Sequence, residues 1–313
     1  MNNYESRLVA MTKIEKNLRC TTVTLVYNTS NTRFRTQLAS DVLPSLNELL
    51  KSIPAKRLKK SVTLVLHSAG GFMDVIGSFI YLMRKNFDKF QVAVPEIAHS
   101  AATLLCFGAD SIFMSDLSSL SPVDPQITLK TQAGHIGAGA EDIKGYYSLI
   151  KDMFKDDSAR IQAFNSLLAR FPAEVLGQIE RIQKQTEMVA SKALQYHITE
   201  KEKIEDIVST FQREFFSHNY RIHFDEAKEL GLKVQTMDKN LEILCSDLLR
   251  QYQSVFGNQA DLEIDIPEGT PYRELTMGRA YLECLHSSFS YKTKSRIFID
   301  KKVEVEELGW SKN

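Results

Sequence analysis

Residues 61–71 read SVTLVLHSAGG, and these eleven residues are the strongest indication of the fold class. Its first part is a short run of leucine and β-branched residues, the pattern of a buried strand. The run ends at Gly70 and Gly71, where glycine permits a sharp turn. Apolar residues then recur at helical spacing between residues 72 and 83, so a helix follows. The stretch therefore predicts one strand–turn–helix unit of an α/β fold.

The same arrangement recurs farther along the chain. A short strand at 90–94 leads into residues 98–110, which read AHSAATLLCFGAD. Again a strand ends in small residues and a helix begins, here at Ser100. Two such turns side by side would place a serine hydroxyl next to bare backbone N–H groups. Acyl-transfer chemistry needs this pairing of a nucleophile with an oxyanion site.

The surrounding segments extend the pattern. Strand-like runs at 22–27 and 111–114 flank the two units, and an amphipathic helix is predicted over 38–50. Strands that alternate with helices indicate a mainly parallel sheet covered by helices. The Gly- and Ala-rich residues 132–140 are predicted to form a loop, and residues 157–212 to form long helices.

Composition excludes several classes of function. The chain has 313 residues with 39 basic and 39 acidic side chains, so the balance indicates neither a nucleic-acid nor an anionic-membrane partner. Its four cysteines form no C-x-x-C pair, which favours free thiols in a reducing compartment. No signal peptide or membrane span is predicted, so the expected location is the cytoplasm. No metal-ligand spacing or phosphate loop is present, and no cofactor is expected.

Three motifs together carry a family resemblance: Gly70-Gly71, residues 98–104 and the run LSPVDPQ at 120–126. They resemble the serine dehydrogenase proteinase family, which belongs to the Clp and signal-peptide-peptidase-A group of serine peptidases. Weaker similarity extends the match to roughly residues 20–235. The resemblance implies an α/β crotonase-type spiral of β-β-α units with a helical insertion.

Composition, strand and helix patterns and the extent of the resemblance together divide the chain. Residues 1–19 are expected to be an N-terminal arm, either a short helix or a loose segment. Residues 20–238 would be the peptidase domain. Residues 239–313 would be a small α+β appendage that ends in a charged tail at 301–310.

Ser100 is the predicted nucleophile, with Gly70, Gly71 and Ala101 supplying oxyanion N–H groups. The N–H of Ala101 would lie at a helix N-terminus, where the helix dipole favours negative charge. The alternative for Ser100 is an ordinary helix N-cap, a common role for serine.

The general base has two candidates. Lys144 lies at the distance from Ser100 at which the signal-peptide-peptidase-A relatives carry a lysine, and a partly buried lysine can act as a base. Its alternative is a solvated helix lysine. His218 lies in a segment that resembles a family His-Asp-Tyr motif, with Asn219 replacing the carboxylate; its alternative is a loop histidine that caps the next helix. His99 and His67 are interpreted as cleft-lining or supporting residues.

The predicted function is a serine peptidase acting on peptide or protein substrates. Resemblance to the Clp group implies a homo-oligomer, and a separate unfoldase or regulator for folded substrates. The helices of 157–212 would then either contact other copies or present solvated faces. Two alternatives stay open: an inactive Clp-fold assembly protein, and a crotonase-type enzyme acting on acyl-thioesters.

Overall fold

The computed structural model describes residues 3–29, 36–124, 126–131, 134–170, 173–213, 215, 217, 219–257, 270–299 and 302–313. The helices are α1 (Asn3–Leu18), α2 (Val42–Ser52), the 3₁₀ helix η2 (Ala55–Arg57), α3 (Asp74–Asn86), α4 (Ala101–Phe107), α5 (Ala140–Met153), α6 (Asp157–Arg170), α7 (Ala173–Leu194), α8 (Lys201–Arg213), α9 (Phe224–Glu229) and α10 (Lys239–Gly257). The strands are β1 (Thr21–Tyr27), β2 (Ser61–His67), β3 (Lys89–Val94), β4 (Ile97–Ala98), β5 (Ser111–Met114), β6 (Ser119–Leu120), β7 (Gln126–Thr131), β8 (Gly134–Gly139), β9 (Val234–Thr236), β10 (Tyr272–Cys284), β11 (Ser287–Phe298) and β12 (Val303–Lys312).

The predicted α/β architecture is confirmed. The central sheet has the order β12-β11-β10-β1-β2-β3-β5-β9, and the strands from β1 to β9 run parallel. Parallel strands need crossover connections, and α3 and α4 supply two of them. Beside this sheet, β4 and β6 form a second, short parallel pair. Residues 89–107 thus form one repeating unit of the fold, which consists of a long strand (β3), a short strand (β4) and a helix (α4).

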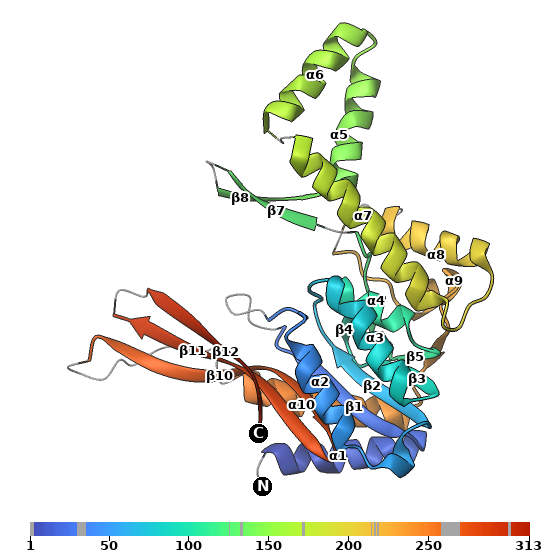
Figure 1. Cartoon of the computed structure of the whole chain (residues 1–313), viewed down its shortest axis with the longest axis vertical. Coiled ribbons are helices and arrows are strands. Elements are labelled where there is room, and N and C mark those ends of the chain that lie inside the picture. Colours follow the sequence, from blue (N-terminus) through green and yellow to red (C-terminus); the bar gives the residue numbers. More distant parts are fainter. Residues whose placement is uncertain are drawn as a thin grey trace.

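Side chains alternate between two apolar layers along each central strand. Leu25 and Leu64 face the core beneath α2, α3 and α4, whereas Val26 and Val65 face a separate core against α1 and α10. When helices cover both faces of a parallel sheet, the side chains on both faces are buried. This explains why the strand segments of the sequence are almost continuously hydrophobic. Figure 1 shows these helices on the two sides of the sheet.

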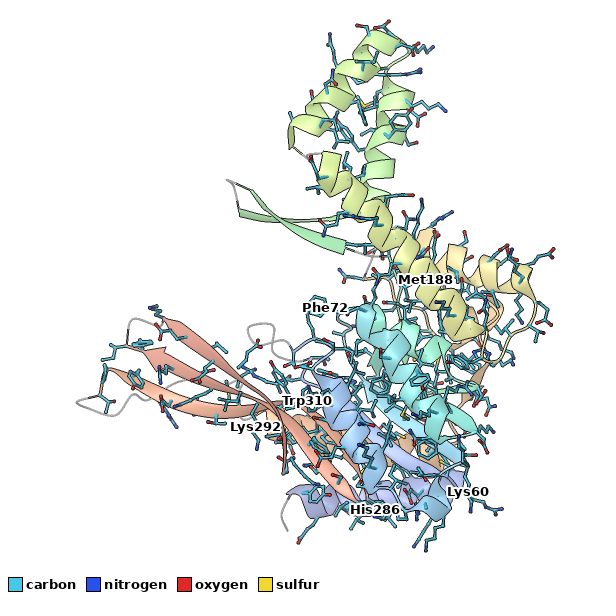
Figure 2. All side chains as sticks on the ribbon, viewed as in Figure 1. Lys60, Phe72, Met188, His286, Lys292 and Trp310 are labelled. Atoms are coloured by element: carbon cyan, nitrogen blue, oxygen red, sulfur yellow. The ribbon has the colours of Figure 1, made fainter. Side chains whose placement is uncertain are left out.

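The N-terminal and C-terminal segments lie together on this sheet. Helix α1 packs against α10, and Met11 of α1 is fully buried in the core that the two helices share. Strand β10 pairs antiparallel with β1, so the segment expected as an appendage continues the central sheet. The expectation of a charged tail at 301–310 is wrong for its described part, because β12 pairs along β11. Trp310, labelled in Figure 2, packs edge-on against Tyr27 and Tyr291.

The insertion projects from the sheet. Helices α5 and α6 and the upper part of α7 extend away from the body, with the β7–β8 hairpin beside them (Figure 1). The loop expected at 132–140 is therefore wrong for residues 134–139, which form β8. Glycine and alanine carry little strand preference, but the antiparallel ladder with β7 satisfies their backbone groups. The expected long helices of 157–212 are confirmed as α6, α7 and α8.

Candidate active site

Ser100 occupies a sharp turn between β4 and α4. Its backbone has φ 52° and ψ −120°, a conformation that non-glycine residues rarely adopt. The turn is held by two hydrogen bonds: the Ser100 N–H donates to the Ser121 Oγ at 2.7 Å, and the Ala102 N–H donates to the His99 carbonyl at 2.9 Å. A strained serine between a strand and a helix is the geometry of a nucleophile elbow, which presents the hydroxyl at the start of the helix.

The capping alternative for Ser100 does not describe this structure. Ser100 precedes the first residue of α4, but its side chain makes no capping hydrogen bond. Its hydroxyl bonds to no residue in the part of the chain that the structure describes, and the residue is only partly buried. The serine oxygen is therefore available to a substrate rather than committed to the helix.

Gly70 lies directly against this serine. Gly70 has φ 105°, and a Cβ added to it would come within 2.8 Å of both the Ser100 Cβ and the His99 carbonyl oxygen. A Cβ on Gly71 would collide with the backbone of Leu38, which pairs with the glycine segment through a parallel bridge. Both positions thus require glycine for close backbone approach, and the two predicted turns do lie side by side.

Two backbone N–H groups at this point are not used by the fold. Across the described residues, neither the Gly71 N–H nor the Ala101 N–H donates a hydrogen bond, whereas the Gly70 N–H donates to the Ser68 Oγ at 3.1 Å. Of the three predicted oxyanion donors, Gly71 and Ala101 are thus unoccupied and Gly70 is engaged. Ala101 is also the first residue of α4, where the helix dipole adds positive potential.

A cleft of about 670 Å³ opens over Ser100. Four of the predicted site residues line it: Gly70, Gly71, Ser100 and Ala101. The lining also includes residues that sequence reasoning missed, namely Ser121, Ile182, Gln185 and Phe72. Phe72 is labelled in Figure 2 at the end of the body that faces α7. Ile182 and Gln185 lie on α7 and carry no local signal, because their helix reaches the cleft only through the fold.

The two candidate bases cannot be placed from the described side chains. Lys144 lies on α5, and its side chain falls outside the described part of the structure. His218 lies outside the described residues altogether. Its neighbour Asn219 is described, and it lines the cleft.

The two other histidines have fixed partners near the cleft. His99 lines the cleft, and its Nε2 lies 2.9 Å from the Ser119 Oγ. His67 is 2% exposed, with its Nε2 2.9 Å from the Thr29 Oγ1. Burial lowers the pKa of His67 to about 4, with a smaller contribution from nearby His99. His67 is therefore neutral near pH 7, in line with a supporting rather than an acid–base role.

The described residues carry neither a candidate metal site nor a membrane-spanning helix. No group of three or more His, Cys, Asp or Glu side chains there could hold a metal ion. None of the helices within those residues is both long and apolar enough to cross a membrane.

Comparison with known proteins identifies relatives of this chain. Two uncharacterised proteins of Methanocaldococcus jannaschii are similar to this chain. The first is 26% identical, and the match covers 60% of this chain and 58% of the relative. The second is 23% identical, and the match covers 67% of this chain and 63% of the relative. The chain thus spans less than two thirds of the length of these curated relatives. Among solved structures, the ClpP1 N165D mutant from Listeria monocytogenes matches 73% of this chain and 99% of its own, with 13% identity and a TM-score of 0.36.

A family model described as ClpP-like SDH-type serine proteinase matches residues 2–273, which is most of the chain. The chain belongs to the family of ClpP-like SDH-type serine proteinases.

Proposed function

We propose that this protein is a serine peptidase that cleaves peptide bonds through an acyl-enzyme on Ser100. The observation that carries the proposal is the position of Ser100, whose strained turn presents an unbonded hydroxyl beside the unused N–H groups of Gly71 and Ala101. A peptide carbonyl placed between them would meet a nucleophile and two oxyanion donors at once.

The chemistry follows from this arrangement. The Ser100 oxygen attacks the peptide carbonyl carbon while the general base takes the hydroxyl proton, and the oxyanion accepts hydrogen bonds from Gly71 and Ala101. The base then gives its proton to the leaving amine, so that the C–N bond breaks and an ester on Ser100 remains. Water hydrolyses the ester by the same steps in reverse. Each oxyanion donor of this kind contributes about 3–4 kcal/mol to the transition state.

We keep Lys144 and His218 as the two proposed bases. Family membership supports a serine mechanism without specifying the base. Substitution separates the two: loss of activity in Lys144→Met with retention in His218→Gln would identify the lysine, and the converse would identify the histidine. A lysine base also predicts a more alkaline rising limb of the rate against pH.

Self-assembly is also proposed. Large apolar side chains are exposed on the projecting helices α5 and α6: Tyr147, Leu149, Met153, Ile161 and Phe164. An exposed apolar patch on a projecting element is typical of an interaction site. Light scattering of the natural chain and of a Met153→Lys, Ile161→Lys double variant would test whether copies associate through these helices.

Two further expectations are proposals as well. A separate unfoldase or regulator would be needed for folded protein substrates. A reducing compartment such as the cytoplasm is supported by the cysteines, all four of which are free and buried.

The deciding experiment is labelling with a reactive fluorophosphonate, followed by intact-mass analysis of the natural chain and of Ser100→Ala. A single adduct that is lost in the variant supports the activated serine. The absence of an adduct at every pH tried would favour an inactive assembly protein. Acyl-thioester binding measured by calorimetry in that case would favour the crotonase-type alternative.

A further inference from the structure

A second cavity lies at the opposite end of the parallel strands from Ser100. Its volume is about 340 Å³, and Thr21 and Ser61, the first residues of β1 and β2, line it. Small-molecule sites in proteins have volumes of about 300–1,000 Å³. Figure 2 labels Lys60, which lines this cavity, at the bottom of the body, and Phe72, which lines the catalytic cleft, near the top of the body. The cavity is therefore separate from the candidate active site.

Cationic side chains from three parts of the chain meet in this second cavity, which we call the basic cavity. Among the described residues, four cations line it: Lys16 and Arg19 at the end of α1, Arg57 in η2, and Lys60 just before β2. The lining holds one acidic side chain, Glu15. Four positive charges less one negative charge leave a local excess of three, although the whole chain carries 39 basic and 39 acidic side chains.

Three of these cations are accessible to a ligand. Lys16, Arg19 and Lys60 are exposed as well as lining the basic cavity. Among the described residues, no carboxylate forms an ion pair with any of them, whereas Arg57 pairs with Glu15. Their charged groups are therefore free to meet an anion that enters the cavity.

The fourth cation, Arg57, is held in place by a buried carboxylate. Glu15 is 8% exposed, its Oε1 accepts a hydrogen bond from the Thr22 N–H at 3.0 Å, and its Oε2 forms the ion pair with Arg57. The carboxylate is thus anchored to β1, and it orients the guanidinium before any ligand binds. A guanidinium has five N–H donors, so the pair with Glu15 leaves others for a bound oxyanion.

The fold balances only part of the positive charge in the basic cavity. The carboxyl end of α1 carries a partial negative charge of about half a unit, which favours Lys16 and Arg19 at that position. Together with Glu15 this makes about 1.5 negative units against four positive ones. Like charges at close range repel one another and destabilise the folded state. A ligand with about two or three negative charges would balance the remainder.

Phosphate compounds meet this requirement better than carboxylates. A carboxylate carries one negative charge, whereas a phosphoryl group carries about 1.5–2 at pH 7 and offers three strong acceptor oxygens. Guanidinium groups bind phosphate through paired N–H···O hydrogen bonds, and lysines act as point charges. Because the four cations surround a cavity rather than follow a stripe along the surface, the occupant is a small molecule.

We propose that the basic cavity binds a small phosphate compound, with Arg19 and Arg57 donating to the phosphate oxygens and Lys16 and Lys60 adding positive charge. The inference goes beyond the proposed peptidase function and does not depend on it. The basic cavity shares no lining residue with the cleft over Ser100.

The first test is a calorimetric titration with inorganic pyrophosphate. The cavity variant carries Lys16→Gln, Arg19→Gln and Lys60→Gln. The control variant removes the same number of charges at exposed lysines that line neither the basic cavity nor the catalytic cleft: Lys192→Gln, Lys228→Gln and Lys239→Gln. We expect the Kd to rise at least about tenfold in the cavity variant and less than about twofold in the control variant.

Two results of this titration would overturn the site. One is the absence of binding to the natural chain, and the other is equal weakening in the two variants, which would show attraction to overall charge alone. Citrate, a carboxylate of similar charge, is titrated at the same ionic strength. Citrate binding as tight as that of pyrophosphate would contradict the assignment to phosphate compounds. If the cavity variant does not fold, Lys60→Gln alone serves the same titration.

The second test measures the repulsion directly by urea unfolding at low ionic strength, where charges are least screened. Without ligand, the cavity variant should unfold at a higher urea concentration than the natural chain, because three repelling charges are gone. Pyrophosphate should raise the midpoint of the natural chain and of the control variant but not that of the cavity variant. A cavity variant that is less stable than the natural chain would show that these cations serve the fold itself, and the proposal would then be wrong.

Discussion

The Cα of Gly70 lies so close to Ser100 that a Cβ on the glycine would stand 2.8 Å from the serine Cβ. The two turns are therefore a single packed unit, in which the backbone of one turn fixes the side chain of the other. Ser100 can keep its strained backbone conformation in this position because Gly70 has no side chain that would collide with it.

The strain at Ser100 predicts a separation of stability from activity. Ser100→Gly and Ser100→Ala should both abolish fluorophosphonate labelling, because each removes the hydroxyl. Ser100→Gly should nevertheless be more stable than Ser100→Ala by about 1 kcal/mol, since glycine adopts φ 52° without strain. Urea unfolding measures the difference, and equal unfolding free energies would show that the turn is unstrained.

Gly70→Ala should impair the site while the fold persists. The new Cβ would press on Ser100 and on the His99 carbonyl at φ 105°, so we expect a loss of about 2 kcal/mol in stability. Displacement of the nucleophile should lower the labelling rate about 100-fold or more.

Gly77→Ala is the matched control for this substitution. Gly77 is exposed on α3, and nothing lies within 4 Å of a Cβ there. Alanine should stabilise the helix by about 0.5–1 kcal/mol and leave labelling unchanged. A similar loss of labelling in both variants would contradict the packed arrangement of the two turns.

The contact between the two ends of the chain rests on a buried ion pair. The guanidinium of Arg7 on α1 donates to both carboxylate oxygens of Glu283 on β10, at 2.8 Å each, and Glu283 also accepts from Tyr252 and Ser288. Glu283→Gln would leave Arg7 buried and uncompensated, which should cost about 3–5 kcal/mol in the unfolding free energy. Glu274→Gln, which breaks exposed pairs with Lys294 and Arg296, should scarcely change it.

His67 predicts a loss of stability in acid. Burial lowers its pKa from the ordinary value of 6.5 to about 4, so between these values the unfolded chain binds a proton that the folded chain does not. The unfolding free energy should therefore fall as the pH drops through this window, by up to about 3 kcal/mol. His197, whose pKa is also lowered mainly by burial, contributes in the same direction.

Urea unfolding between pH 7 and pH 4 checks this dependence. His67→Gln should show a shallower loss of stability than the natural chain over that range. His286→Gln changes an exposed histidine in the turn between β10 and β11 (Figure 2), and it should behave like the natural chain. Parallel pH profiles for all three proteins would contradict the assignment to His67.

The local elements of the catalytic half could be predicted from residue patterns alone. Hydrophobic runs, their spacing and the glycines predicted β1, β2, β3 and β5 and the helices between them, because burial on both faces of a parallel sheet leaves a continuous apolar signature. The same local signals located the two turns, since a strand that ends in small residues before a helix needs no distant partner to be recognised.

Which segments pack against these turns depends on contacts between distant parts of the chain. The pairing of β10 with β1 joins residues more than 250 positions apart, and alternation within one strand does not say which strand lies beside it. The acidic segment of β12 and the glycine-rich β8 likewise became strands through their ladders rather than through their own preferences. The uncapped Ser100 hydroxyl, its support by Ser121 and the unpaired ring nitrogen of His67 depend on contacts between separate turns of the chain, and such contacts leave no periodic trace in the sequence.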